Sequence, residues 1–149
     1  MIKLFKFSKE VKQARTFVGL LLESLSINTF PELIVPVPSH PVDEVKRGFA
    51  HMSYVAYLLS AKLNIPSEKV IFRKFFPVLK RNQKIKTKKE RIQKIDRFYL
   101  RKNVDIKDKN ILLIDDVRTT GMSMDECAKI LLLNGAAKVE GVSLALTAF

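Results

Sequence analysis

The sequence predicts an α/β fold, with a mostly parallel central sheet and helices on both of its faces. Short apolar runs that are typical of buried strands alternate along the chain with segments of helical periodicity. A strand, a helix and a second strand then follow one another between residues 110 and 146. The chain has 149 residues, of which 47% are hydrophobic, enough for a single folded domain over residues 1–149.

Two helices and one strand are predicted in the first half of the chain. Apolar residues recur three and four positions apart from Ser8 to Ser26, which indicates an amphipathic helix that Ser8 can cap. Leu33 to Val37 is a short apolar run closed by prolines, and it predicts a buried strand that leads into a rigid loop. Helical spacing returns from Gly48 to Leu63.

The second half of the chain predicts strands separated by shorter helices. Thr87 and Glu90 stand at the spacing of a capping box, and so do Ser123 and Glu126, so a helix is expected to begin at each site. Gly135 is placed to end the second of these helices. The expected strands are residues 70–76, 98–100, 110–114 and 139–146, and the expected helices are residues 88–95 and 123–134.

The composition excludes several classes of protein. Cys127 is the only cysteine, so neither a disulfide framework nor a paired-cysteine zinc site can form, and no zinc is expected. The longest apolar run, Val18 to Leu22, is much shorter than the roughly 20 residues of a membrane-spanning helix, and no signal peptide is recognisable. We therefore expect a cytoplasmic protein without membrane insertion, in which Cys127 is a buried helical residue.

Most of the net charge lies on one segment. The chain carries 27 Lys and Arg against 15 Asp and Glu, a formal charge of +12. Residues 73–102 hold 13 of these basic residues and two acidic ones, and therefore +11 of the charge. This basic segment is either a solvated face or a region that attracts the phosphates of a nucleic acid or a small metabolite. The basic residues at its centre are Arg81, Lys84, Lys86, Lys88, Lys89 and Arg91.

Two carboxylates and a hydroxyl-rich loop follow the most apolar strand. Ile111 to Ile114 predicts a fully buried strand, and Asp115 and Asp116 come directly after it, at the end where ligands of parallel sheets bind. The loop from Thr119 to Ser123 then leads into a helix, whose free N–H groups suit a phosphate. The carboxylates suit sugar hydroxyls or a hydrated Mg²⁺, so a sugar phosphate satisfies both halves of the site.

This strand and loop resemble the phosphoribosyl pyrophosphate signature of type I phosphoribosyltransferases, an apolar strand with two acidic residues and a Thr-Thr-Gly loop. The resemblance implies a type I phosphoribosyltransferase-like fold. It also implies that Asp115 and Asp116 act as catalytic residues at the ribose hydroxyls, and that Mg²⁺ is held there mainly through the ligand or water. The loop that would bind the ribose phosphate comprises Val117, Arg118, Thr119, Thr120, Gly121, Met122 and Ser123.

A second set of motifs narrows the family. The segments Pro36-Val-Pro-Ser-His-Pro41 and Lys46-Arg-Gly-Phe49 resemble the Pro-Val-Pro-x-His-Pro and Arg-Gly-Phe segments of the ComF family of competence-associated, phosphoribosyltransferase-like proteins. The cysteine-rich zinc-binding segment that many members carry at the N-terminus has no counterpart in this sequence. The resemblance implies that pyrophosphate is contacted by Ser39, His40 and Arg47.

The resemblance implies a protein of competence and DNA uptake that binds phosphoribosyl pyrophosphate and Mg²⁺. As an enzyme it would displace pyrophosphate from C1 of the ribose with a nitrogen nucleophile, although neither the acceptor nor a general base is legible. The alternative is a non-catalytic component of the DNA-uptake machinery that holds single-stranded DNA on the basic segment. The sequence leaves open whether the basic segment is an active-site lid over the pyrophosphate or a DNA-binding surface. It also leaves the oligomeric state open, with a homodimer among the alternatives.

Overall fold

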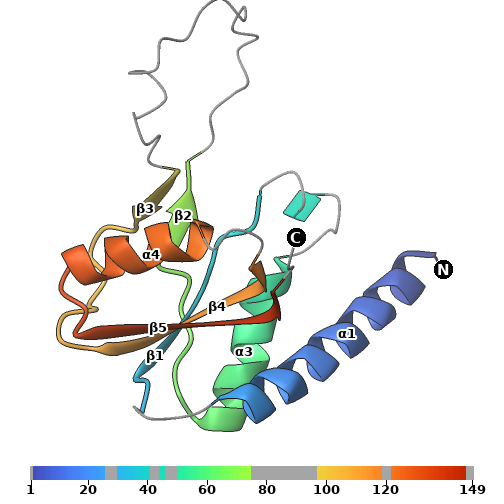
Figure 1. The fold of residues 1–149 in the computed structure, drawn as a ribbon. Helices are drawn as coiled ribbons and strands as arrows, with labels where there is room; N and C mark the ends of the chain where they lie inside the picture. The colour runs from blue at the N-terminus through green and yellow to red at the C-terminus, as the bar shows by residue number, and fades with distance from the viewer. Residues whose placement is uncertain are drawn as a thin grey trace, which may run out of the picture.

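Three parallel strands form the central sheet of this computed structural model, with β4 (Asn110–Arg118) between β1 (Leu33–Pro36) and β5 (Lys138–Leu146) (Figure 1). The structure describes residues 2–25, 30–40, 44–45, 50–74, 97–118 and 122–146. All four aliphatic residues from 111 to 114 are buried, because β4 is the middle strand and is covered on both faces.

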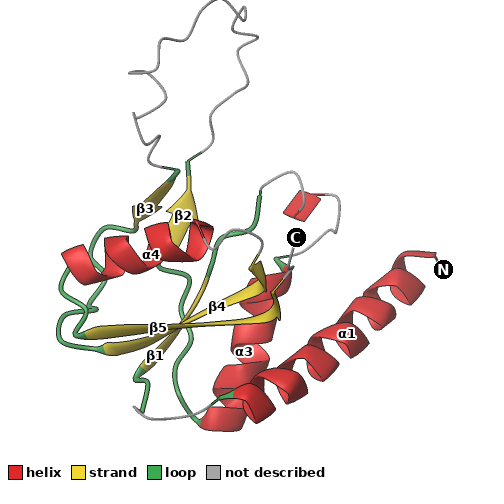
Figure 2. Cartoon of the chain, in the orientation of Figure 1, coloured by secondary structure: helices red, strands yellow, loops and turns green. Residues whose placement is uncertain are grey.

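Two helices cover one face of the sheet, α1 (Ile2–Ser24) and α3 (His51–Leu63) (Figures 1 and 2). Residues three and four positions apart on each helix meet the even-numbered side chains of the strands, because successive strand residues point to opposite faces. This cluster contains Ala14, Val18 and Leu21 of α1, Met52, Val55, Ala56 and Leu59 of α3, and Ile34, Leu112 and Ile114 of the sheet.

The other face is covered by α4 (Met122–Leu133) and by an antiparallel pair of strands, β2 (Ile71–Arg73) and β3 (Phe98–Leu100), here called the hairpin (Figure 1). The odd-numbered side chains of β1 and β4 form this second cluster with residues of α4 and the hairpin. Its members include Leu33, Val35, Ile111 and Leu113 of the sheet, Cys127 and Leu131 of α4, and Ile71 and Phe98 of the hairpin.

The predicted α/β architecture with helices on both faces is confirmed, and so is the burial of Cys127 in a helix. Gly135 ends α4 as expected, because its φ of 100° is a conformation that other residues adopt only with strain. Among the residues that the structure describes, no helix has the length and apolar character needed to cross a membrane.

Several predicted boundaries are wrong. α1 begins at Ile2 and not at Ser8, because no proline or glycine precedes Ser8 to stop the helix. α3 begins at His51 and not at Gly48. The strand expected over residues 70–76 spans only Ile71–Arg73 and pairs with β3, outside the parallel sheet. The helix expected over residues 88–95 lies outside the described residues.

Candidate functional site

The two carboxylates lie inside a strand and not after it. β4 continues through Asp115 and Asp116 to Arg118, so the predicted strand end at Ile114 is wrong. The ladder extends because β5 runs alongside, with Asp115 in register with Ser143. Backbone pairing does not depend on the polarity of the side chains, so the strand continues beyond the last aliphatic residue, Ile114.

Asp115 and Asp116 are both half-buried and point to opposite faces of the sheet. Asp115 follows Leu113 and faces the side covered by α4 and the hairpin, whereas Asp116 follows Ile114 and faces the side covered by α3. The carboxyl end of the middle strand therefore carries one carboxylate on each of its sides.

Asp115 sits in an environment that favours its neutral form. Burial raises the pKa of the Asp115 carboxyl from 3.8 to about 7, and the negative charge of Asp116 adds to the rise. The main-chain N–H of Asp116 donates a hydrogen bond of 2.9 Å to Oδ1 of Asp115, which lowers the pKa, as does the positive charge of Arg73. Near neutral pH this carboxyl therefore exists in both forms, and an approaching cation or hydrogen-bond donor favours the ionised one.

The loop after β1 leaves the sheet at the same edge. The main-chain N–H of Val37 donates a hydrogen bond of 2.9 Å to the carbonyl of Ile114, so the chain passes directly beside the carboxylates. Ser39, which is half-buried, and His40, which is exposed, follow within three residues. The structure thus brings Ser39 and His40 to the edge where parallel strands bind ligands, whereas Arg47 lies outside the described residues.

Only part of the predicted phosphate loop lies within the described residues. Val117 and Arg118 are the last two residues of β4, and Met122 and Ser123 are the first two of α4. The loop residues outside the described ranges are Thr119, Thr120 and Gly121. Three residues therefore connect the end of the middle strand to a helix N-terminus, whose unpaired N–H groups favour an anion.

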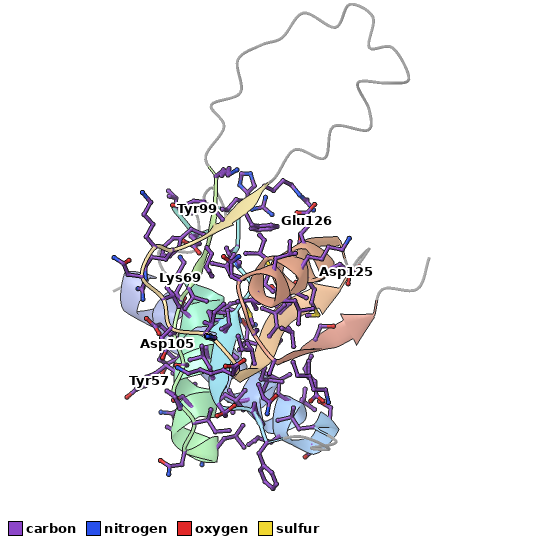
Figure 3. All side chains as sticks on the ribbon, turned by 90° about the vertical axis from the view of Figure 1, so that its left-hand side faces the viewer. Tyr57, Lys69, Tyr99, Asp105, Asp125 and Glu126 are labelled. Atoms are coloured by element: carbon purple, nitrogen blue, oxygen red, sulfur yellow. The ribbon has the colours of Figure 1, made fainter. Side chains whose placement is uncertain are left out.

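Glu126 has a different partner from the one that its spacing predicts. A capping box would bring this carboxylate back to the helix N-terminus beside Ser123, but α4 already begins at Met122. Instead, Oε2 of Glu126 accepts a hydrogen bond of 3.1 Å from Nε of Arg97. Figure 3 shows Glu126 on α4 close to the hairpin that carries Tyr99. The bond joins the hairpin to the helix that follows the phosphate loop.

Arg73 and Arg97 belong to this region, and sequence reasoning counted them only toward the charge of the basic segment. Arg73 is the last residue of β2 and Arg97 directly precedes β3, so both lie at the end of the hairpin next to residues 75–96, the part of the basic segment outside the described ranges. Their position at these two junctions is the signal by which the sequence could have singled them out. The central basic residues lie outside the described ranges, namely Arg81, Lys84, Lys86, Lys88, Lys89 and Arg91.

The described part of the chain contains no group of three or more His, Cys, Asp or Glu side chains that could enclose a metal ion. Asp115 and Asp116 are the carboxylates available at the strand end, and they supply oxygen donors on its two sides. This donor set fits a hydrated Mg²⁺, because Mg²⁺ commonly keeps several waters and binds through one or two carboxylates together with the phosphates of its ligand.

Comparison with curated proteins finds two competence proteins. The chain is 26% identical over 152 residues to competence protein F of Haemophilus influenzae, a match that covers 97% of this chain and 66% of that protein. It is 29% identical over 146 residues to competence protein ComFC of Bacillus subtilis, covering 94% of this chain and 56% of that protein. The chain thus spans about two thirds of one relative and just over half of the other. No family model matches the chain.

Two of the solved structures with a similar fold are phosphoribosyltransferases. The purine phosphoribosyltransferase of Pyrococcus horikoshii Ot3 has a TM-score of 0.57 and 23% identity, over 90% of this chain and 73% of that one. The orotate phosphoribosyltransferase of Aeropyrum pernix has a TM-score of 0.50 and 18% identity, over 87% of this chain and 57% of that one. These structural matches give the chain a type I phosphoribosyltransferase fold, and its similarity to the two competence proteins agrees with the motifs around Asp115 and His40 that resemble the ComF family.

Proposed function

We propose that this protein binds phosphoribosyl pyrophosphate together with Mg²⁺ at the carboxyl edge of its parallel sheet. One observation carries the proposal: Asp115 and Asp116 lie near the carboxyl end of the middle strand, beside the loop that contains Ser39 and His40, and only three residues separate the end of that strand from the N-terminus of α4. This arrangement offers hydrogen-bond acceptors for ribose hydroxyls and unpaired N–H groups for a phosphate within one short segment.

Each group of the site has a distinct task in this proposal. Asp115 and Asp116 accept hydrogen bonds from the two ribose hydroxyls and hold the waters of the metal ion, which neutralises the charge of the pyrophosphate when it is bound. The loop from Val117 to Ser123 takes the ribose phosphate, and Ser39, His40 and Arg47 contact the pyrophosphate. If the protein is an enzyme, these contacts orient C1 of the ribose toward a nitrogen nucleophile and stabilise the leaving charge.

A thermal-unfolding experiment tests the proposal. Phosphoribosyl pyrophosphate and Mg²⁺ are expected to raise the melting temperature of the wild type, since a ligand at 100 times its Kd adds about 2.7 kcal/mol of stability. The double variant Asp116→Asn, Thr120→Ala removes the acceptor and a loop hydroxyl and is expected to lose the increase. Asp105→Asn is the matched control, because Asp105 is an exposed carboxylate paired with Lys109. An unchanged melting temperature of the wild type at millimolar ligand contradicts the proposal.

A second candidate function, the binding of single-stranded DNA, is favoured by one observation on the hairpin. Phe72 and Tyr99 face each other across β2 and β3 with ring centroids 5.8 Å apart and planes 26° from parallel. Nζ of Lys69 lies 5.3 Å from the Phe72 ring centroid, and Tyr99 is 46% exposed. Stacked aromatic side chains beside cations are the usual platform for unpaired bases, so DNA could lie on the hairpin and the basic segment.

Fluorescence anisotropy with an oligothymidine tests this second candidate. Tyr99→Ala is expected to weaken binding by about 5- to 100-fold, the usual range for loss of one base-stacking partner. Tyr57→Ala is the control, because Tyr57 is 63% exposed but lies on α3. Neutralising Lys84, Lys86, Lys88 and Lys89 together should reduce the salt slope by about 2–3, at roughly 0.7 for each phosphate contact. Equal affinities for wild type and Tyr99→Ala would remove the hairpin from the DNA surface.

The role in competence rests on the similarity to two competence proteins, the cytoplasmic location rests on the sequence, and both are part of this proposal. The two relatives are named competence proteins, and each is longer than the part that this chain matches. A cytoplasmic protein that takes part in competence and binds phosphoribosyl pyrophosphate would act on transforming DNA or on a nucleotide precursor after uptake. Deletion of the gene, complemented by wild type or by Asp116→Asn, would reveal whether transformation depends on the phosphoribosyl pyrophosphate site.

A further inference from the structure

Two arginines at the end of the hairpin meet α4 through one carboxylate. Arg73 is in register with Phe98 across the two strands, and Arg97 directly precedes Phe98. Cζ of Arg73 lies 5.0 Å from the centroid of the buried Phe98 ring, and Cζ of Arg97 lies 5.6 Å from it. Among the described residues, Glu126 of α4 is the one carboxylate at ion-pairing distance from either guanidinium, 3.1 Å from Nε of Arg97. A charge-assisted hydrogen bond therefore ties α4 to the hairpin.

Water cannot easily replace this bond. The side chains of Arg97 and Glu126 are 34% and 28% exposed, and Nη2 of Arg97 is buried without a hydrogen-bond partner among the described residues, as is Nε of Arg73. Without the charge of Glu126, two guanidinium groups would lie beside one ring with no carboxylate partner in the described part of the chain. Like charges repel more strongly at partly buried sites than in water. The bond is therefore favoured and restricts the movement of α4 relative to the hairpin.

The bond holds α4 close to its N-terminus. Glu126 comes four residues after Met122, the first residue of the helix, so the two residues are roughly 6 Å apart along the helix axis. Residues three positions apart share one helix face, so Ser123, the last residue of the proposed phosphate loop, lies on the same face as Glu126. A rotation of α4 at Glu126 would therefore also move the N–H groups that the helix end offers to a phosphate.

The sheet holds the same end of α4 at a second point. Met124 is buried against Gly141 of β5, where a Cβ atom would lie only 3.1 Å from Cγ of Met124. Met124 and Glu126 are two positions apart and therefore point in directions that differ by roughly 160° around the helix. One contact alone would leave α4 able to turn about it, whereas two contacts on different sides oppose the turn. The ion pair thus completes the fixation of the helix end.

We propose that Arg97 and Glu126 are positioning residues for the phosphate loop, because their bond fixes the N-terminus of α4 in the orientation that binds a phosphate group. This inference rests on the proposed function and concerns two residues to which that function assigns no ligand contact. Free N–H groups bind an anion best when they converge on it beforehand, since a helix end that has to turn first loses part of the binding free energy. Loss of the bond is therefore expected to weaken phosphate binding.

A direct effect of charge predicts the opposite result for Glu126. A carboxylate near an anion-binding helix end repels the anion, so its neutralisation alone should raise the affinity for phosphate. Asp125 supplies the comparison, because it lies in the first turn of α4, is exposed and has no ion pair among the described residues. Figure 3 labels both carboxylates on α4. Asp125→Asn therefore measures the effect of charge alone, whereas Glu126→Gln measures the loss of charge together with the loss of the bond.

Isothermal titration calorimetry with ribose 5-phosphate, on proteins shown to be folded by circular dichroism, tests the inference. Glu126→Gln and Arg97→Gln are each expected to weaken binding by about three- to tenfold, and the double variant by about the same factor, since all three break one bond. Asp125→Asn is expected to strengthen binding, by up to about threefold at low salt. Arg101→Gln loses the same charge as Arg97→Gln, but Arg101 follows β3 and pairs with Glu68, so its affinity should stay within about twofold of wild type.

Three results would overturn the inference. If charge alone acted, Glu126→Gln would bind more tightly than wild type, and the double variant would return to wild-type affinity because its two charge changes cancel. Wild-type affinity in every folded variant would mean that the bond only stabilises the fold. Glu126→Asp covers the case in which the glutamine variant does not fold, because it keeps the charge but is one methylene shorter. Weaker binding by this variant supports the inference, and wild-type affinity contradicts it.

Titration with phosphoribosyl pyrophosphate and Mg²⁺ separates this inference from the proposed function. If the wild type binds ribose 5-phosphate, the variants at Arg97 and Glu126 bind it more weakly, and phosphoribosyl pyrophosphate does not bind, the inference stands and the proposed function fails. If the wild type binds both ligands and these variants bind them equally well, the proposed function stands and the inference fails. If the wild type binds neither ligand, both fail.

Discussion

Nε of Arg97 donates a hydrogen bond of 3.1 Å to Oε2 of Glu126, two residues that are 29 positions apart in the sequence. Arg97 directly precedes β3 of the hairpin, and Glu126 lies on α4, the helix that follows the phosphate loop. Through this contact, the placement of the hairpin and the placement of α4 depend on each other. The contact is local in space and invisible in the sequence.

Glu126→Gln is expected to lower the free energy of unfolding by about 0.5–1.5 kcal/mol. The substitution replaces a charge-assisted hydrogen bond at a half-buried site with a neutral one, and Arg97 then has a weaker acceptor. Urea denaturation measures the change. Glu68→Gln is the control, because the Glu68–Arg101 pair is more exposed and should contribute less than about 0.5 kcal/mol. An equal loss in both variants would mean that the Arg97–Glu126 contact stabilises the fold no more than the exposed Glu68–Arg101 pair does.

Asp115→Asn is expected to change how stability depends on pH. Because burial raises the pKa of Asp115 to about 7 in the folded protein, the folded state binds more protons than the unfolded state between pH 3.8 and 7. The contribution of Asp115 to stability is therefore present at low pH and is lost as the pH rises through this interval. The asparagine variant carries no such loss, and at pH 8 it should be more stable than wild type by about 1–2 kcal/mol, less than a fully buried carboxylate would give.

Denaturation of wild type and Asp115→Asn at pH 4.5, 6 and 8 checks this prediction. The difference in unfolding free energy between the two proteins should grow with pH and should be small at pH 4.5. Asp105→Asn is a suitable reference, because Asp105 is exposed. A difference that stays constant over the three pH values would contradict the assignment.

Cys127 should not react with thiol reagents in the folded protein. Burial raises its pKa to about 12, with the charges of Asp115 and Glu126 adding to the rise, and its side chain is fully buried. The reactive thiolate is therefore scarce at pH 8 and inaccessible as well. Titration with a disulfide reagent should detect almost no thiol in buffer and one per chain in 6 M urea, since Cys127 is the only cysteine. Rapid labelling in buffer would show that α4 leaves the sheet.

Gly141→Ala is expected to destabilise the protein by about 1–3 kcal/mol. A methyl group at this position of β5 would lie 3.1 Å from Cγ of Met124 and closer still to its sulfur, so the buried Met124 side chain would have to move from its place between α4 and the sheet. Met124→Ala removes the obstructing side chain, and the double variant should recover part of the loss. Urea denaturation of the four proteins in this cycle gives the coupling energy, and strictly additive losses would contradict the contact.

Leu113→Ala is expected to lower the free energy of unfolding by about 2–5 kcal/mol, because Leu113 is fully buried between the sheet and α4. Leu133 is the last residue of α4 and is 86% exposed, so Leu133→Ala should change the free energy of unfolding by less than about 0.5 kcal/mol. Chemical denaturation of both variants measures the difference. Similar losses at the two positions would contradict the placement of the core.

The sequence by itself determined the α/β class, the order of most helices and strands, and the motifs that resemble the ComF family. These features are local: four consecutive aliphatic residues require burial on both faces, and the proline-rich run after Leu33 must leave the sheet. It also predicted a site at Asp115, Asp116, Ser39 and His40, and the structure brings these residues to one edge because the carboxyl ends of parallel strands meet there. Their role in binding stays a prediction.

Only the tertiary structure decided where the strand ends and how the arginines are used. β4 extends to Arg118 because β5 lies beside it, and this pairing depends on a segment more than 20 residues away. Glu126 bonds to Arg97 because the hairpin packs against α4, so a spacing typical of a capping box gave the wrong partner. Arg73 and Arg97 became distinct from the rest of the basic segment only when folding set both beside Phe98 and left each with a buried donor.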